Sequence, residues 1–244
     1  MNIYSSIQEK IAKGKKSFSI LVDPDKFDNV RFEKTAKLAE ESKTDYLFVG
    51  GSLLTNGNFH TCIKILKDNC SVPVILFPGN TLQIDEQADA ILFLSLISGR
   101  NPELLIGKHV ISAPLIKEKK LECISTGYIL VESGNITSVL YMSNTQPVPR
   151  DKMEIAASTA LAGELLGLKM IYLEAGSGAL NPVPEEMIKA VRKNISVPLI
   201  VGGGIKTAEK AMANCKAGAD MIVCGNAIEK DQNLIKEIAS AVHT

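Results

Sequence analysis

Eight short apolar runs recur along this chain of 244 residues, and segments with helical spacing separate them. The runs are residues 17–23, 45–50, 72–77, 88–95, 125–133, 170–175, 197–203 and 219–225. They are continuously apolar, which is typical of parallel strands buried on both faces. Helical patterns occupy residues 29–42, 58–69, 150–167, 184–194, 207–219 and 231–243. Eight strands alternating with helices predict an α/β protein, a (β/α)8 TIM barrel.

A doubly wound open sheet is the alternative architecture for such a pattern. That fold more often shows GxGxxG after its first strand, and this chain has DPDK there, at residues 23–26. No composition break divides the sequence, so we expect a single domain over residues 1–244. The pattern is weakest in residues 96–122, where Pro102 and Pro114 would frame a helix. The helical element near residues 80–87 would be very short.

Composition excludes several classes of protein. The chain has 27 basic and 27 acidic residues, so no net charge attracts nucleic acid or an anionic membrane. Its five cysteines lack CxxC spacing and its three histidines are far apart, which favours buried reduced thiols over a metal cluster. The first residues contain no apolar signal segment, and no run reaches the ~18 residues of a membrane span. We expect a cytoplasmic protein.

Three consecutive glycines, Gly202 to Gly204, stand where the seventh apolar run meets a helical segment, with Thr207 as the expected N-cap. Glycines at a strand-to-helix turn leave backbone amides and the helix dipole open to an anion. The sixth run ends in YLEAGSGA, residues 172–179, and the eighth is followed by Gly225 and Asn226. Glycine often serves only to make a tight turn, but three neighbouring loops of this kind predict a phosphate site.

Two acids follow the first strand and suggest a metal site. Asp23 and Asp25 lie at the expected mouth of the barrel, and Pro24 stiffens the turn between them. With Ser52 after the second strand, they present oxygen ligands suited to Mg²⁺. The alternative is a turn with a helix cap, since aspartate favours both. A metal site opposite a phosphate site suits two anionic substrates, one of them a diphosphate that leaves with Mg²⁺.

Seven motifs in the chain resemble geranylgeranylglyceryl phosphate synthase and its bacterial relatives. They are DPDK (23–26), VGGS (49–52), FPGN (77–80), PVPRDK (147–152), YLEAGSGA (172–179), VGGGIKT (201–207) and GNAIEKD (225–231). The resemblance implies a prenyltransferase on a TIM barrel modified around its third helix. It would join a geranylgeranyl or longer prenyl diphosphate to the C3 hydroxyl of sn-glycerol 1-phosphate, forming an ether lipid precursor and diphosphate. A modified third helix would conflict with the helical pattern of residues 57–69.

The resemblance also implies the site residues. Asp23 and Ser52 would bind Mg²⁺, with Asp23 preferred over Asp25, and Lys26 and Arg150 would bind anionic groups unless they are surface charges. The residues implied to hold sn-glycerol 1-phosphate are Tyr172, Leu173, Glu174, Ala175, Gly176, Ser177, Gly178, Gly203, Gly204, Gly225 and Asn226.

The chemistry suggests a role for one acid and a place for the hydrocarbon. Glu174 would orient the glycerol hydroxyls and accept the proton of the attacking one, or else serve as a hydrogen-bond partner alone. Residues 92–99 and 125–133 are candidates for an apolar groove, although such runs are more often plain core strands. The amphiphilic product makes transient membrane contact plausible without an anchor.

Two other functions are compatible with the sequence. A sugar-phosphate isomerase or lyase would share the phosphate corner but would need an interior lysine or a carboxylate pair. A phosphometabolite-binding protein would keep the pocket without the chemistry, and the joint presence of Asp23, Ser52 and Glu174 argues against it. The family resemblance implies a homo-oligomer, a dimer or a hexamer.

Overall fold

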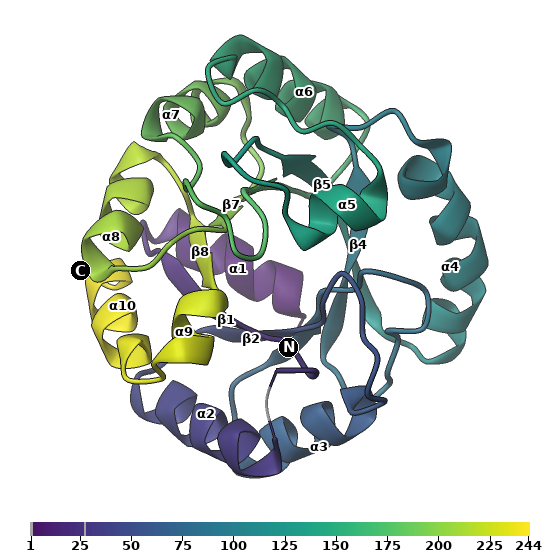
Figure 1. Cartoon of the computed structure of the whole chain (residues 1–244), viewed down its shortest axis with the longest axis vertical. Helices are drawn as coiled ribbons and strands as arrows, with labels where there is room; N and C mark the ends of the chain where they lie inside the picture. Colours follow the sequence, from purple (N-terminus) through teal and green to yellow (C-terminus); the bar gives the residue numbers. More distant parts are fainter. Residues whose placement is uncertain (1, 27) are drawn as a thin grey trace.

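A closed barrel of parallel strands forms the centre of the protein. In the computed structural model, which describes residues 2–26 and 28–244, eight strands pair in chain order and β8 returns to pair with β1 (Figure 1). The predicted TIM barrel is therefore confirmed. The strands are β1 (Ser17–Val22), β2 (Tyr46–Val49), β3 (Val74–Leu76), β4 (Ala90–Leu96), β5 (Glu122–Leu130), β6 (Met170–Glu174), β7 (Leu199–Gly202) and β8 (Met221–Cys224).

Each predicted apolar run overlaps one strand, but the ends differ from the prediction. β5 begins at Glu122, three residues before the run that starts at Ser125, and pairs with β4 from Ala90↔Glu122 to Leu96↔Tyr128. Apolarity did not reveal this start, because Glu122 is polar and Cys123 is exposed. β3 is limited to three residues.

Side chains along each strand alternate between the barrel interior and the layer beneath the helices, as the two-residue period of a strand requires. On β6, Met170 and Tyr172 belong to the interior cluster, whereas Ile171 and Leu173 belong to the outer core. This alternation decides which residues at the end of a strand can face the mouth of the barrel.

The six predicted helices form and surround the barrel. They are α2 (Asn29–Glu41), α3 (Phe59–Asn69), α6 (Met153–Leu165), α7 (Glu185–Asn194), α8 (Ala208–Ala217) and α10 (Leu234–Val242). The predicted N-cap of α8 is confirmed, because the Thr207 side chain accepts a hydrogen bond from the Lys210 amide at 3.3 Å. Asp28 caps α2 in the same way through Arg31, at 2.9 Å.

The barrel departs from a regular one between β3 and β4. Residues 77–89 contain turns and no helix, so the very short helix expected near residues 80–87 does not form. Counted by strands, this is the place of the third helix, and the modification implied by the family resemblance lies here. Residues 59–69 are helical as α3, so the pattern of residues 57–69 was a sound predictor.

The stretch between β4 and β5 is helical, and Pro102 precedes its first turn as predicted, whereas Pro114 does not end it. A π-helical turn, η1 (Glu103–Gly107), runs directly into α4 (Lys108–Glu118). Pro114 lies inside α4 instead of framing it. Its side chain is exposed, so this proline sits on the water-facing side of the helix, where solvent can satisfy the carbonyl it leaves unpaired.

An N-terminal helix that the sequence pattern did not predict, α1 (Ile3–Ala12), lies across the far end of the barrel in the view of Figure 1. Ile3 and Ile7 are buried in the interior cluster. The Glu122 carboxylate accepts hydrogen bonds from the amides of Ile3 at 2.6 Å and Tyr4 at 2.8 Å. The bottom of the barrel is therefore closed, and the opposite end is the one left to bind ligands.

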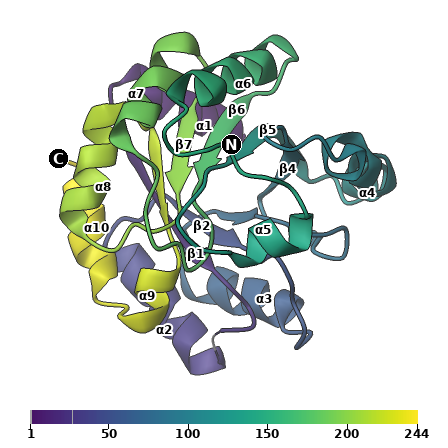
Figure 2. The same cartoon turned by 45° about the horizontal axis from the view of Figure 1, so that its top comes forward.

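Two short helices lie at that open end: α5 (Ser138–Ser143), between β5 and α6, and α9 (Asn226–Lys230), after β8 (Figure 2). Among the described residues, no helix combines the length and apolarity that crossing a bilayer requires.

Candidate active site

A cavity of about 620 Å³ opens at the carboxyl ends of the strands, where active sites of TIM barrels lie. Residues after β1 and β2 form one side of it, and residues after β6, β7 and β8 form the other. The predicted site residues on its wall are Asp23, Lys26, Ser52, Tyr172, Glu174, Gly176, Ser177, Gly178, Gly203, Gly204, Gly225 and Asn226. The structure thus brings together most of the residues selected from the sequence.

The corner formed by β6, β7 and β8 offers backbone amides to an anion. Gly176, Gly178, Gly203 and Gly204 all have positive φ, between +71° and +99°, which turns the chain sharply at both loops. Within the described part of the chain, the amides of Ser177, Gly203 and Gly204 find no acceptor. Unpaired amides gathered on a polar cavity form a site suited to phosphate.

The glycines of the VGGGIKT motif have a packing role in addition to leaving backbone amides open to an anion. A Cβ on Gly202 would lie 2.5 Å from Tyr172 Oη, and one on Gly203 would lie 2.3 Å from Glu174 Oε1. A Cβ on Gly204 would lie 3.0 Å from the backbone of Pro182. Because these glycines have no side chains, the β7 loop can pack against the β6 loop. The unpaired amides lie where the two loops meet.

Asn226 joins two of the three loops. Its Oδ1 accepts hydrogen bonds from Ser177 Oγ at 3.0 Å and from the Gly178 amide at 2.8 Å. Its Nδ2 donates to Glu229 Oε2 at 3.0 Å. The β6 loop is therefore attached to α9, and this fixes the position of the Ser177 and Gly178 backbone.

Leu173 and Ala175, predicted to hold substrate with their neighbours, direct their side chains elsewhere. Both are buried in the outer core, because the alternation along β6 places them on the side away from Tyr172 and Glu174. Their side chains therefore do not reach a ligand in the cavity.

Glu174 is the buried acid of the site. It is 5% exposed, and its Oε1 accepts a hydrogen bond from the Gly176 amide at 2.6 Å. Burial raises the pKa of Glu174 to about 7, although the Gly176 amide and the Tyr172 hydroxyl oppose this. The Tyr172 hydroxyl lies beside the carboxylate over Gly202, outside strict hydrogen-bond geometry. A carboxyl group with this pKa is suited to accept a proton at neutral pH.

On the opposite side, Asp23 faces the segment that carries Ser52. A Cβ on Gly51 would lie 3.5 Å from Asp23 Oδ1, so the two loops are adjacent. Partial burial raises the pKa of Asp23, while the Asp25 amide, donating to Oδ1 at 3.0 Å, lowers it. A half-buried carboxylate and a hydroxyl that line the same cavity are oxygen donors of the kind that suits Mg²⁺.

Asp25 has a different environment from Asp23. Its carboxylate accepts hydrogen bonds from the Thr55 amide at 2.6 Å, Thr55 Oγ1 at 2.9 Å and the Asn56 amide at 3.3 Å. It therefore holds the β2 loop in place, which favours the sequence-based preference for Asp23 as the metal ligand.

The two predicted basic residues are separated. Lys26 lines the cavity, near Asp23 and Glu229. Arg150 instead donates to the backbone oxygens of Glu132 at 3.1 Å and Pro182 at 3.4 Å. Arg150 is therefore a brace between loops, because its guanidinium is already directed at these carbonyls.

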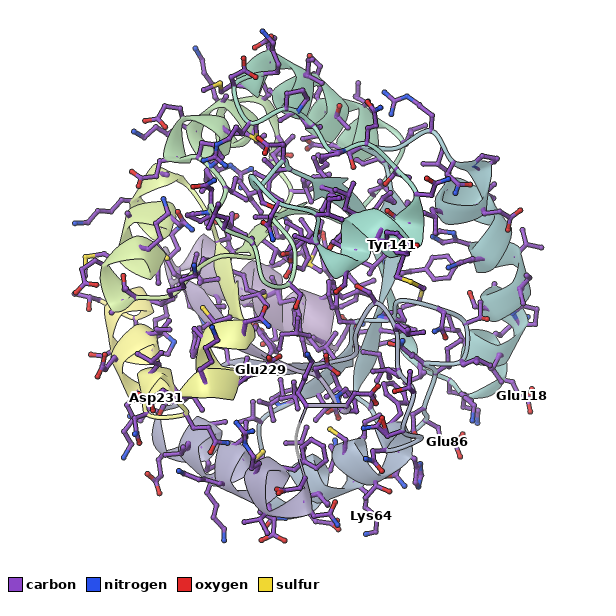
Figure 3. The ribbon with its side chains drawn as sticks, in the orientation of Figure 1. Lys64, Glu86, Glu118, Tyr141, Glu229 and Asp231 are labelled. Atoms are coloured by element: carbon purple, nitrogen blue, oxygen red, sulfur yellow. The ribbon has the colours of Figure 1, made fainter. Side chains whose placement is uncertain are left out.

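Glu229 was not selected from the sequence. Figure 3 shows it projecting from α9 toward the middle of the barrel mouth, and it lines the cavity. Burial and the nearby negative charge of Asp23 raise the pKa of Glu229. The motif GNAIEKD contains it, but no spacing rule distinguished it from the exposed acids around it.

A second cavity, apolar and about 210 Å³, adjoins the first. The predicted groove segments contribute Leu92, Phe93, Leu94, Leu96 and Tyr128. The rest of its wall comes from the loops after β2 and β3, from η1, from α4 and from α5, and nothing in their local sequence pattern indicates a shared pocket. The two cavities share Gly51, Ser52, Leu53, Phe77, Tyr128 and Val139.

A TIM barrel with an open anion corner, a buried acid near neutral pKa and an adjoining apolar groove defines a phosphate-binding barrel enzyme. The pattern of the PcrB family matches residues 9–242, and the chain belongs to this family. The geranylgeranylglyceryl phosphate synthase of Chitinophaga pinensis is 54% identical to it over 241 residues, with 99% of this chain and 96% of the relative covered. The synthase of Pyrococcus horikoshii is 46% identical over 229 residues, covering 93% and 89%.

A solved structure gives the same result. The (S)-3-O-geranylgeranylglyceryl phosphate synthase of Thermoplasma acidophilum, in complex with the substrate sn-glycerol-1-phosphate, superposes with a TM-score of 0.93 at 33% identity. The match covers 100% of this chain and 99% of that one. The family resemblance stated from the sequence motifs is thereby confirmed.

Proposed function

We propose that this protein transfers a long prenyl group from its diphosphate to the C3 hydroxyl of sn-glycerol 1-phosphate, forming an ether lipid precursor and releasing diphosphate. The observation that carries this proposal is the shared wall of the polar cavity and the apolar groove, with Glu174 on the polar side. A reaction between a small phosphate and an apolar chain needs such a junction, because each substrate requires its own environment. The relatives named above support the same chemistry.

The chain's own residues suggest how the reaction proceeds. The amides of Ser177, Gly203 and Gly204 would bind the phosphate and leave the C3 hydroxyl near Glu174. The bond between prenyl C1 and the diphosphate oxygen breaks, and a bond forms between C1 and the glycerol oxygen. The proton of that hydroxyl passes to Glu174, which suits its pKa of about 7.

We propose that Asp23 and Ser52 hold Mg²⁺. When bound, the ion neutralises the departing diphosphate. Proteins usually hold Mg²⁺ with one or two carboxylates together with substrate phosphates, so this sparse donor set is sufficient. Lys26, on the same wall, would contribute a further positive charge.

Transfer of radiolabel tests the proposal. Labelled sn-glycerol 1-phosphate is incubated with prenyl diphosphates from C15 to C35 and Mg²⁺, with sn-glycerol 3-phosphate in parallel, and label is counted in the organic phase. We expect transfer that requires Mg²⁺ and prefers the 1-phosphate, with a C20 or longer chain. Absence of transfer with every chain length would contradict the proposal.

The alternative of a sugar-phosphate isomerase or lyase is disfavoured by the strands themselves. None of the strands, all of which lie in the described part of the chain, contains a lysine that could form a Schiff base. A protein that only binds phosphometabolites would not need the apolar groove. Mg²⁺-dependent release of diphosphate distinguishes the three functions.

We propose that the protein is a homo-oligomer that associates through α6. Ile155, Leu161, Leu165 and the adjoining Leu166 are exposed at helical spacing along this helix, by 45%, 36%, 79% and 80%. An exposed apolar stripe of this kind favours a second copy of the same face. Sedimentation velocity of the chain with Leu161→Lys, against the unchanged chain, would detect loss of the oligomer.

We also propose a cytoplasmic location and transient contact with membranes. All five cysteines are free thiols, which suits a reducing compartment. Leu53 and Met142, which line the apolar groove, are 54% and 49% exposed, so its rim presents apolar side chains outward. Flotation with phospholipid vesicles tests the contact, and absence of binding would contradict it.

A further inference from the structure

We propose that Gln83 is a positioning residue for the diphosphate side of the reaction, a role that rests on the proposed function. Gln83 lies in the loop of residues 77–89 that replaces the third helix, and it is 2% exposed. Its side-chain amide fixes the Gly51–Ser52 segment, which lines both cavities at their junction.

Three hydrogen bonds make this attachment. Gln83 Oε1 accepts from the Gly51 amide at 3.3 Å and from the Gly79 amide at 3.2 Å. Gln83 Nε2 donates to the Gly51 oxygen at 2.8 Å. Both backbone groups of Gly51 are therefore held by one side chain, in the manner of a strand neighbour.

A carboxamide is the group that satisfies these partners. The position needs one acceptor for two amides and one donor for a carbonyl, and a glutamine side chain supplies both. A carboxylate would place an acceptor against the Gly51 oxygen, and an apolar side chain would leave three partly buried backbone groups without this partner. Each unpaired group costs free energy, so the segment would move to restore its bonds.

The loops after β2 and β3 pack closely where Gln83 joins them. A Cβ on Gly50 would lie 2.0 Å from the Phe77 oxygen, and a Cβ on Gly79 would lie 2.3 Å from the Gly51 oxygen. The loops after β2 and β3 thus touch through glycine backbones. Residues 51–56 form neither helix nor strand, so their position depends on contacts such as those of Gln83.

Loss of the Gln83 hydrogen bonds should affect the binding of only one of the two substrates. Ser52 follows Gly51 directly, and Gly51 faces Asp23, so a shift of this segment changes the site proposed for Mg²⁺ and diphosphate. The phosphate corner is built from the loops after β6, β7 and β8, which Gln83 does not contact. Loss of Gln83 should therefore weaken diphosphate binding and leave glycerol phosphate binding intact.

Isothermal titration calorimetry with inorganic diphosphate and Mg²⁺, and separately with sn-glycerol 1-phosphate, tests the inference. For Gln83→Met and Gln83→Glu we expect at least about tenfold weaker binding of Mg²⁺-diphosphate, with glycerol phosphate affinity within about twofold of the parent. The matched control is Gln87→Met, an exposed glutamine of the same loop, which should change neither. Equal weakening of both ligands would indicate a general structural role and overturn the proposal.

Hydrogen exchange separates this inference from the proposed function. In the unliganded chain with Gln83→Met, the amides of Gly51 and Gly79 should exchange at least about tenfold faster, while those of residues 176–178 are unchanged. Unchanged exchange at Gly51 overturns the inference, whatever the protein binds. If the parent chain binds no Mg²⁺-diphosphate but Gly51 exchange responds to Gln83, the proposed function fails and the positioning of the segment stands.

Discussion

The Oε1 atom of Glu174 accepts a 2.6 Å hydrogen bond from the backbone amide of Gly176, two residues further along the chain. Gly176 adopts a φ of +99°, so the chain turns sharply directly after this amide. The hydrogen bond aims the carboxylate and lowers its pKa, but burial outweighs it and leaves the pKa at about 7. The predictions about proton transfer depend on this balance.

Activity should depend on the ionisation of Glu174. Below pH 7 the carboxyl is protonated and cannot accept a proton, so kcat should fall about tenfold per pH unit and level off above pH 7. Glu174→Gln should lower kcat by about 10² to 10⁴ and abolish this dependence, with substrate binding retained. A pH–rate profile at saturating substrate measures both, and an unaltered profile in the variant would contradict the base role.

The same group should make folding stability depend on pH. Its pKa is raised from 4.5 to about 7 on folding, so the folded state binds more protons between these values and loses stability as pH rises through that window. Glu174→Gln should therefore be more stable than the parent at pH 8, by about 1–3 kcal/mol, and not at pH 4. Urea unfolding at both pH values measures this, and equal differences would refute it.

Two glycines of the phosphate corner should respond differently to alanine. At Gly178, with φ +76°, a Cβ meets nothing within 4 Å, so Gly178→Ala should cost only the backbone strain of about 1 kcal/mol. At Gly203, with φ +81°, the Cβ would collide with Glu174 Oε1, so Gly203→Ala should cost more, about 3 kcal/mol, and abolish activity. Denaturant midpoints compare them, and equal losses would exclude the collision.

The two acids after β1 should have separate effects. Asp23→Asn should raise the Mg²⁺ concentration for half-maximal activity by at least about tenfold, because it removes the charge of the carboxylate proposed to hold the ion. Asp25→Asn should leave that concentration unchanged and cost about 1 kcal/mol of stability, since one side-chain oxygen that accepts from the β2 loop is lost. Mg²⁺ titrations of activity decide this, and the reverse pattern would make Asp25 the ligand.

Filling the apolar groove should shorten the preferred prenyl chain. Leu104, in η1, lines this cavity of about 210 Å³, and Leu104→Trp should lower kcat/KM for the C20 diphosphate at least about tenfold relative to C15. Ile106→Trp is the control, because Ile106 lies in the same turn but is 60% exposed. If both variants keep the chain preference of the parent, the groove does not hold the hydrocarbon.

Local pattern was enough to predict the barrel and much of its mouth. Continuous apolar runs form neighbouring strands whatever the details of the loops between them, because parallel strands buried on both faces all require apolar side chains. Glycines at strand ends are likewise required by the backbone conformation at their own positions. Thr207 is an N-cap because its side chain accepts a hydrogen bond from an amide three residues further along the chain. Local pattern did not specify the loop near residues 80–87, the place of Pro114 inside α4, or the directions of the Leu173, Ala175 and Arg150 side chains.

The sequence by itself therefore determined the strands of the barrel and which glycines and acids stand at their ends, because apolar runs and turns are each specified within a few residues. Only the tertiary structure decided which polar side chains are already hydrogen-bonded to distant parts of the chain. Arg150 is directed at loop carbonyls, Glu122 holds α1 across 119 residues, and Gln83 holds Gly51 across 32 residues. The local sequence around a polar side chain does not predict its hydrogen-bond partner. The partner is established only when folding brings distant backbone groups within hydrogen-bond distance.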